Sequence, residues 1–221
     1  MNSVGSWPYE DVRTVANRGF HSNTYLLRMG ADNTCVVVDP GLDREAIEHR
    51  LGAYGWHPKA VLCTHGHFDH VGSAAYFQTK YGCQVFMHKA DMRILKASNF
   101  LLTVFNIPQK IELPDVTCIE DQFCINFGGE PLTYHAAPGH TPGSCVIEFG
   151  DAWFTGDTIY SRGVGLSALP GEDAELLKQT ILSFWDRLTV DRIIYPGHGN
   201  AADGESIRIE NRALLKFLGL V

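Results

Sequence analysis

Short apolar runs alternate with polar turns along this chain, and their periodicity predicts a succession of strands and helices. Runs rich in Val, Ile, Leu and Tyr between Gly, Asn and Asp are typical of strands, whereas apolar residues three or four positions apart are typical of helices. In the first half, this pattern predicts strands at Val12–Val15, Asn23–Met29, Thr34–Val38, Ala60–Cys63 and Gln84–Met87. It predicts helices at Leu42–Tyr54, at Val71–Tyr81 (ending at Gly82) and at Lys89–Lys96.

The second half repeats this organisation. Strands are predicted at Val116–Ile119, Gln122–Asn126, Leu132–His135, Ser144–Phe149, Ala152–Phe154 and Arg192–Tyr195, and helices at Asp173–Leu188 and from about Glu205 to Leu218. Each half is therefore a run of strands with helices after it, which favours an α/β protein with two sheets packed together and helices outside both. No linker, low-complexity stretch or charge block interrupts residues 1–221, so we expect a single domain.

The stretch from 97 to 114 is ambiguous. It is largely apolar, but Pro108 and Pro114 interrupt the pattern. One interpretation is a helix that packs on the body of the protein, and the other is a wall of a substrate cleft.

Composition restricts the class of protein. The 221 residues are 45% hydrophobic and carry a formal net charge of −7, which allows one sizeable core and argues against a nucleic-acid binder. No apolar run approaches the roughly 20 residues that cross a bilayer, and Met1–Trp7 lacks the pattern of a signal peptide. We therefore expect a soluble cytoplasmic protein without a membrane partner.

Cysteine usage points the same way. The six cysteines are scattered through apolar stretches and form no C-x-x-C pair; they are Cys35, Cys63, Cys83, Cys118, Cys124 and Cys145. Buried free thiols are expected rather than a disulfide framework.

Histidines carry the first chemical signal. His65, His67, Asp69 and His70 lie within six residues, directly after an apolar strand. A polar turn that caps the next helix would be the structural explanation, but burying several imidazoles without partners is costly. The cluster therefore predicts metal binding, and two ions about 3.5–4 Å apart could share it.

Three further candidates stand beside glycines at the ends of predicted strands: His140, Asp157 and His198. Loops at strand ends are common places for functional sites, and glycine allows the backbone to approach an ion closely. Imidazole and carboxylate donors without a cysteine suit zinc, iron or manganese.

The combined motifs T-H-G-H-F-D-H-V-G, P-G-H-T-P-G-S, F-T-G-D-T and Y-P-G-H-G closely resemble the metallo-β-lactamase superfamily. The residues of these motifs are most similar to those of the hydroxyacylglutathione hydrolase (glyoxalase II) branch. The resemblance implies an αββα sandwich, the metallo-β-lactamase fold, with two Zn²⁺ at one edge. It implies that the first ion is held by His65, His67 and His140, the second by Asp69, His70 and His198, and both by Asp157. Asp69 and Asp157 would be the catalytic carboxylates, and Asp39 matches a position that orients the site from behind the ligands.

This chemistry predicts a metal-dependent hydrolase in which a metal-bridging hydroxide attacks the substrate, because metal ions lower the pKa of bound water toward 7. A thioester suits such a site, since a thiol of pKa about 8.5 leaves easily. Longer glyoxalase II enzymes have cationic residues for glutathione in a helical C-terminal region, and a Lys and a Tyr that follow the G-D-T motif also contact glutathione. This chain ends at Val221, and its matching stretch, Gly163–Leu169, has neither Lys nor Tyr. A shorter bacterial type has an Arg and an Asp before L-P-G-G, and Leu166 and Ala168 stand near those places here. We therefore expect an acyl group on the phosphopantetheine of coenzyme A or an acyl carrier protein, with hydroxyacyl-glutathione kept as an alternative.

Other activities stay open at this point. An iron-dependent persulfide dioxygenase shares the implied fold, and a lactonase or β-lactamase would use the same ions. The intact ligand positions argue against a non-enzymatic binding module with a relic site.

Overall fold

The computed structural model describes residues 11–18, 20–30, 32–120, 122–127, 131–167, 169 and 171–221, which form two sheets of six strands each. The first sheet follows chain order, with β1 (Val12–Ala16), β2 (Asn23–Arg28), β3 (Thr34–Val38), β4 (His57–Leu62), β5 (Gln84–His88) and β6 (Val116–Ile119). The second has the order β12-β11-β10-β9-β8-β7. Its strands are β7 (Phe123–Ile125), β8 (Leu132–Ala136), β9 (Cys145–Phe149), β10 (Ala152–Gly156), β11 (Ile193–Pro196) and β12 (Ala202–Asp203). Both sheets contain parallel and antiparallel pairs, so both are mixed.

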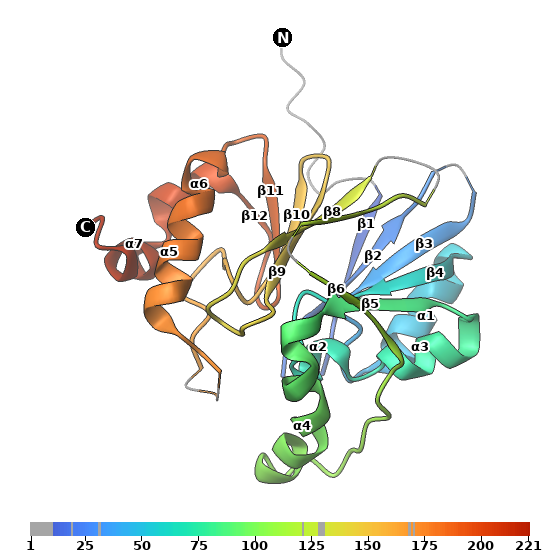
Figure 1. The fold of residues 1–221 in the computed structure, drawn as a ribbon. Coiled ribbons are helices and arrows are strands. Elements are labelled where there is room, and N and C mark those ends of the chain that lie inside the picture. Colours follow the sequence, from blue (N-terminus) through green and yellow to red (C-terminus); the bar gives the residue numbers. More distant parts are fainter. Residues whose placement is uncertain are drawn as a thin grey trace.

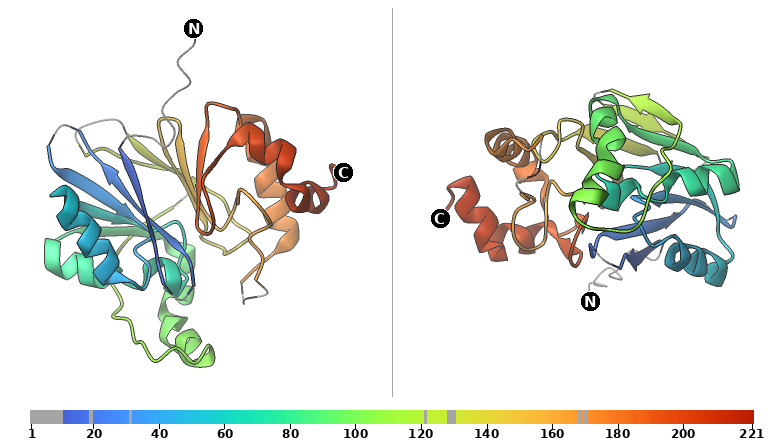
Figure 2. Two further views of the ribbon diagram at one scale, coloured as in Figure 1. Left: turned by 180° about the vertical axis from the view of Figure 1, so that it is seen from behind. Right: turned by 90° about the horizontal axis from the view of Figure 1, so that it is seen from below.

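Helices cover the outer faces of the two sheets, as Figures 1 and 2 show. The first sheet carries α1 (Arg44–Tyr54), α2 (Phe68–Val71), α3 (Ala74–Tyr81) and α4 (Met92–Val104), and the second carries α5 (Ala174–Phe184), α6 (Gly204–Glu210) and α7 (Arg212–Leu218). Short 3-10 turns occupy Lys89–Asp91 and Trp185–Arg187. The expected αββα sandwich of two mixed sheets with helices on both outer faces is confirmed.

Alternation along the strands explains this layering. Val36 and Val38 on β3 face the core between the sheets, whereas Val37 faces the helices of the first half. On β10, Phe154 lies between the sheets and Trp153 packs under α5. Since successive side chains point to opposite faces and both faces are buried, the central strands are apolar throughout.

Two predicted helices are each split in two. The one predicted at Val71–Tyr81 breaks at Ser73, whose backbone N–H donates to the carbonyl of Pro40 at 2.9 Å rather than within a helix. The C-terminal one breaks at Asn211, whose side chain accepts from the Leu214 N–H at 3.1 Å and so begins α7. The apolar periodicity of the sequence continues across both breaks because α3 packs on the same core as α2, and α7 packs on the same core as α6.

The ambiguous stretch after Lys96 is mostly helix. The helix predicted at Lys89–Lys96 begins with a 3-10 turn, and α4 then runs on to Val104. Both prolines lie beyond its end, so they do not interrupt it. Leu102 packs in the core, as the helix interpretation predicts. Phe105 lines a cavity, and the interpretation as a wall of a substrate cleft stays a prediction.

Burial of the cysteines was only partly predicted. All six are free, and four are buried, but Cys118 and Cys124 are exposed. These two lie on β6 and β7, the last strands of their sheets, where one face meets solvent.

Among the described residues, no helix has the length and apolar character to cross a membrane. Met1–Trp7 and Ala168 lie outside the described residues.

Candidate metal centre

The residues singled out by their motifs converge where strands of both sheets end. Asp39 follows β3, Asp157 follows β10, and His198 lies just beyond β11. Backbone hydrogen bonds join the sheets here, from Cys145 N to Thr64 O at 2.8 Å and from Asn23 N to Gly197 O at 2.7 Å. The sandwich therefore supplies a fixed edge for side chains that are far apart in the sequence.

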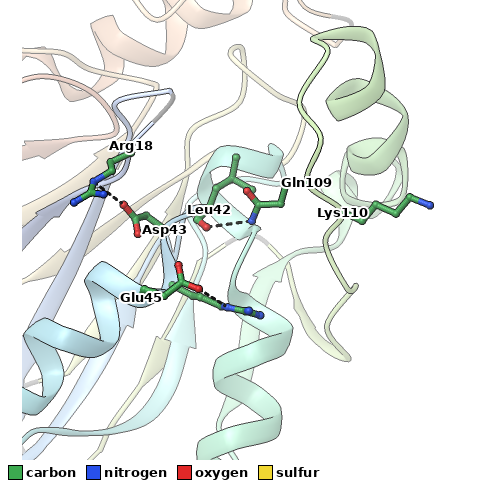
Figure 3. A pocket seen from close by; sticks show the side chains of 7 residues that line it. Arg18, Leu42, Asp43, Glu45, Gln109 and Lys110 are labelled. Atoms are coloured by element: carbon green, nitrogen blue, oxygen red, sulfur yellow. Dashed lines mark hydrogen bonds and ion pairs between the residues drawn. The ribbon is translucent and has the colours of Figure 1, made fainter.

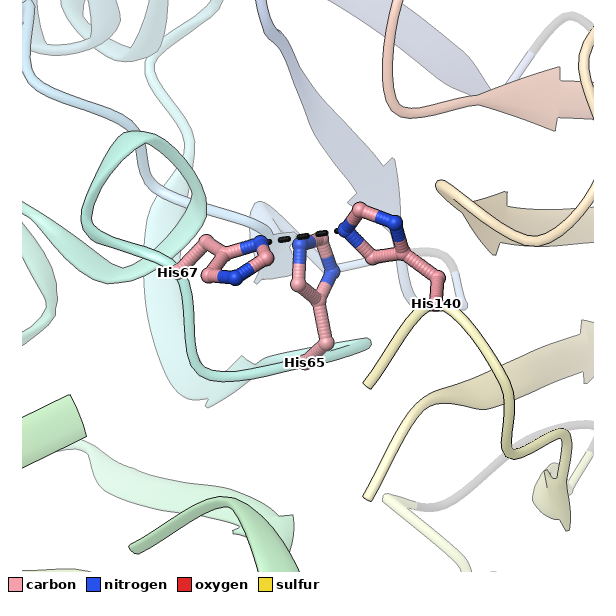
Figure 4. Close-up of side chains that lie close together, drawn as sticks. All are labelled: His65, His67 and His140. Carbon is pink, nitrogen blue, oxygen red and sulfur yellow. Dashed lines mark hydrogen bonds between the residues drawn. The ribbon is translucent and has the colours of Figure 1, made fainter. Parts of the chain in front are cut away.

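The first ligand group consists of His65, His67 and His140, whose nitrogens lie within 4.8 Å of one another. Figure 4 shows the three rings turned toward a common point. His140 donates from Nδ1 to the carbonyl of Gly165 at 2.9 Å, so its Nε2 carries a lone pair, and this atom lies 3.0 Å from Nδ1 of His67. A cation between the two rings would use both nitrogens.

Thr64 fixes the tautomer of His65. The Thr64 hydroxyl donates to Oδ2 of Asp39 at 2.7 Å, so it accepts from Nδ1 of His65 at 3.0 Å. Nε2 of His65 is then an acceptor, and it is buried without a hydrogen-bond partner. Such outer hydrogen bonds orient the histidine ligands of metal sites.

The second group consists of Asp69, His70 and His198. Nδ1 of His70 donates to Oδ2 of Asp39 at 3.0 Å, so Nε2 is the acceptor atom of the neutral ring. This Nε2 is buried and has no hydrogen-bond partner among the described residues. Nε2 of His198 lies 3.3 Å from Oδ2 of Asp69. Asp39 thus orients both groups from behind, as expected from the resemblance, and its Oδ1 accepts from the Thr64 N–H at 2.7 Å.

Asp157 stands between the two groups. Its Oδ2 lies 3.4 Å from Nε2 of His140 and 3.6 Å from Nε2 of His198, and its Oδ1 lies 3.4 Å from Nε2 of His70. One carboxylate therefore faces both sets of nitrogens, which is the position required to bridge two ions.

The electrostatics show an excess of negative charge around His70. Burial opposes protonation, but the carboxylates of Asp157, Asp69 and Asp39 raise the pKa of His70 to about 10. In the other group, burial and the adjacent His140 lower the pKa of His67 to about 4. One side of the site thus favours a positive charge and the other offers neutral nitrogen donors.

Divalent cations fit this arrangement. Nε2 of His65, Nε2 of His70 and Oδ1 of Asp157 are buried atoms without hydrogen-bond partners, and all three point into the site. Buried polar atoms without partners are rare, and acceptors that converge need a positively charged ligand. The site residues predicted from the motifs are therefore brought together as two groups that can each hold an ion.

Asp91 was missed by the sequence analysis. It is fully buried, and its Oδ2 accepts from the N–H of Gly66 at 2.8 Å and from the hydroxyl of Thr141 at 2.7 Å. Its Oδ1 accepts from the N–H of Gly143 at 2.6 Å. One carboxylate thus ties the loop of the first histidines to the loop of His140. An Asp between a strand and a helix is typical of an ordinary cap, so only the fold reveals this role.

Replacing Asp91 by Asn should weaken zinc binding about 10- to 100-fold, the usual effect of removing an outer partner. The amide can accept through one oxygen only, and its own N–H groups would face the N–H of Gly66 or Gly143. Competition with a chromophoric chelator measures the affinity, and circular dichroism checks the fold. The exposed Asp151→Asn is the matched control. Equal zinc affinity in Asp91→Asn and wild type would show that this carboxylate does not position the ligands.

Other histidines do not belong to the site. His21, His49 and His57 are exposed. His135 stands five residues before His140 in the chain, but its Nε2 pairs with Glu148 at 2.6 Å beside Phe184. Alternation on β8 turns it toward the helix side of the second sheet.

Two cavities adjoin the candidate metal centre and share His198 in their walls. One, of about 270 Å³, is lined by His67, His140, Asp157 and several aromatic and aliphatic side chains. The other, of about 640 Å³, is polar and contains Arg162. A third cavity lies apart from these ligands, and Figure 3 shows its Arg18 paired with Asp43, at 3.6 Å.

Comparison with known proteins agrees with this geometry. An αββα sandwich with two His/Asp groups at its edge is typical of a class of metal-binding protein. The family model of the metallo-beta-lactamase superfamily matches residues 17–198. The chain belongs to the metallo-beta-lactamase superfamily.

Individual relatives extend this finding. A hydroxyacylglutathione hydrolase of Anaeromyxobacter dehalogenans is 33% identical over 184 residues, which cover 83% of this chain and 64% of that enzyme. The crystal structure of TTHA1623 in a di-iron-bound form has a TM-score of 0.81 at 27% identity, covering 91% of this chain and 99% of that one. The crystal structure of the BLEG-1 B3 metallo-beta-lactamase has a TM-score of 0.84 at 26% identity, covering 92% and 99%.

Proposed function

We propose that this protein is a dinuclear zinc hydrolase of thioesters. The observation that carries the proposal is Asp157, which lies between two groups of buried donors whose free acceptor atoms point at common centres. Two bound divalent cations would supply an activated water and polarise the substrate carbonyl. The hydroxyacylglutathione hydrolase relative supports a hydrolase, and nitrogen and carboxylate donors suit zinc.

The chain's own residues have separate roles. His65, His67 and His140 would hold one ion, and Asp69, His70 and His198 would hold the other, with Asp157 placed to serve both. Asp39 fixes the ring of His70 directly and that of His65 through Thr64. Because these partners are already in place, the donors need little rearrangement to bind the ions.

A pantetheine thioester is our preferred substrate class. Glutathione carries two carboxylates. Among the described residues that line the two cavities beside the ligands, the one Lys or Arg is Arg162, and it shares its cavity with Asp203 and Glu210. Leu166, which is 38% exposed, lines the other cavity. The pantetheine arm of a carrier has no carboxylate, so it does not need a cationic wall. Coenzyme A and acyl carrier protein are the carriers that present this arm.

Thiol release from matched thioesters tests this proposal. The zinc-loaded protein would receive one acyl group on glutathione, on a short pantetheine mimic and on a carrier protein. We expect the largest kcat/KM with the pantetheine forms. A preference for glutathione would overturn the choice of carrier, and absence of release from all three would overturn the thioesterase proposal. Oxygen uptake with a persulfide by the iron-loaded protein would then support the dioxygenase.

A β-lactam or lactone ring is the second candidate substrate, because the BLEG-1 structure matches nearly the whole chain at 26% identity. A strained ring opens by the same attack on a carbonyl. Ring opening of a chromogenic cephalosporin and of a homoserine lactone, measured beside the thioesters, would rank the three classes. Faster ring opening than thiol release would favour this second candidate.

A further inference from the structure

We infer that the aromatic cleft beside the candidate metal centre is an acyl-binding site for an apolar, uncharged acyl chain. The inference rests on the proposed thioesterase function and names the half of the substrate that this function leaves open. The aromatic cleft is defined by Phe20, Phe68, Phe105, Leu166 and Leu169. Its chemistry is that of a site for a hydrocarbon chain.

Three phenylalanines from distant parts of the chain build one wall. The Phe20 ring meets Phe68 edge-on at 4.9 Å between centroids and Phe105 at 5.8 Å, and Phe68 lies 5.9 Å from Phe105. Phe68 is buried, while Phe105 remains 43% exposed at the end of α4. Mutual contact holds the rings in place, so the wall offers a preformed apolar surface rather than loose side chains.

The aromatic cleft is continuous with the ligand groups. His67, His140 and Asp157 line the same cavity as the phenylalanines, and Phe68 directly follows His67 in the chain. A carbonyl placed at the ligand groups would therefore direct one of its two substituents along the aromatic wall.

Polarity decides which substituent this is. Among the described residues, the ionisable side chains lining the aromatic cleft are the candidate ligands and Tyr160, and none is Lys or Arg. The neighbouring cavity, which shares His198, is lined by Arg162, Asn200 and Ser206 together with Asp203 and Glu210. The amides of a pantetheine arm need hydrogen-bond partners, so the arm suits the polar cavity, and the acyl chain suits the aromatic cleft.

The volume limits the chain length. About 270 Å³ corresponds to roughly nine water-sized groups at about 30 Å³ each. A straight chain of roughly six to eight carbons fills this space. Longer chains would extend past Phe105 toward solvent.

The test measures kcat/KM for pantetheine thioesters from acetyl to dodecanoyl, with malonyl as the charged member. We expect wild type to gain up to about fourfold per methylene, with a maximum near six to eight carbons, and to hydrolyse malonyl poorly. Phe105→Ala should lower kcat/KM for octanoyl at least tenfold and leave acetyl within about twofold. Phe100→Ala is the matched control, because Phe100 lies on the same helix, is 69% exposed and does not line the cleft.

The outcomes separate this inference from the proposed function. Absence of hydrolysis of every thioester in the series by wild type would mean that the thioesterase proposal fails. Acetyl hydrolysis without any gain on lengthening the chain would overturn the acyl site alone. The same chain-length profile in Phe105→Ala and Phe100→Ala would also overturn it. Leu166→Lys gives a second readout, since it should raise malonyl turnover and lower octanoyl turnover.

Discussion

Replacing Asp157 by Asn is expected to lower kcat/KM at least about a thousandfold, which corresponds to a barrier higher by about 4 kcal/mol. The amide keeps one acceptor oxygen and turns an NH₂ group toward His70 on one side or toward His140 and His198 on the other. One of the two ions then loses a ligand and meets a donor in its place. Zinc content measured by mass spectrometry should fall below that of wild type together with thiol release.

Asp186→Asn is the control for this variant, because Asp186 lies exposed on the 3-10 turn after α5. It should keep wild-type activity and zinc content. If Asp157→Asn kept a tenth or more of the activity, a shared carboxylate could not be central to the site.

Gly197→Ala should inactivate the protein by a purely steric route, with turnover at least about a hundredfold lower. A Cβ at this position would lie 2.0 Å from Oδ1 of Asp157 and 2.7 Å from Cε1 of His70. Either the backbone of Gly197 or the two side chains must move, and overpacking of this kind also costs about 1–3 kcal/mol of stability. Steady-state kinetics, zinc content and thermal unfolding measure the three effects.

Gly52→Ala is the control that separates the steric effect at the candidate site from the general effect of replacing a glycine by alanine. Nothing lies within 4 Å of a Cβ at Gly52, which is exposed in α1. This variant should be stabilised by about 0.5–1 kcal/mol and remain fully active. Wild-type turnover and zinc content in Gly197→Ala would contradict the described geometry of Asp157 and His70.

The candidate ligands could be predicted because their signal is local. His65, His67, Asp69 and His70 follow one strand within six residues, and the remaining three stand in short glycine-rich motifs. Strand ends at the same edge of a sandwich bring such residues together, so motif and topology reinforce each other. The positions of most strands along the chain were likewise readable, since buried strands such as Thr34–Val38 are continuously apolar.

Residues whose side chains join distant loops were harder to predict. Asp91 receives its donors from loops 25 and about 50 positions away, and Asn211 accepts from the Gly163 N–H at 3.1 Å, 48 positions away. No spacing rule connects such partners, because the contacts exist only after the two sheets have packed. The contact of His135 is another example, since its separation of five residues from His140 along the chain does not reveal that the strand turns it toward Glu148.

The aromatic cleft could be predicted from the sequence only in part. Its members come from three segments, and Phe105 follows a helix whose end periodicity alone did not locate. Apolar residues in such a stretch are compatible with a packed helix and with a cleft wall. The distinction depends on whether another element covers them, which is a property of the folded chain.

The most direct test of the central claim is a zinc titration of the metal-free protein, followed by thiol release from an octanoyl-pantetheine thioester and from its acetyl counterpart. The account predicts that release rises with added zinc, reaches its maximum at two zinc ions per chain, and is abolished in Asp157→Asn at the same zinc concentration. The account would be contradicted if neither thioester released its thiol at two zinc equivalents, or if activity returned only with iron and consumed oxygen.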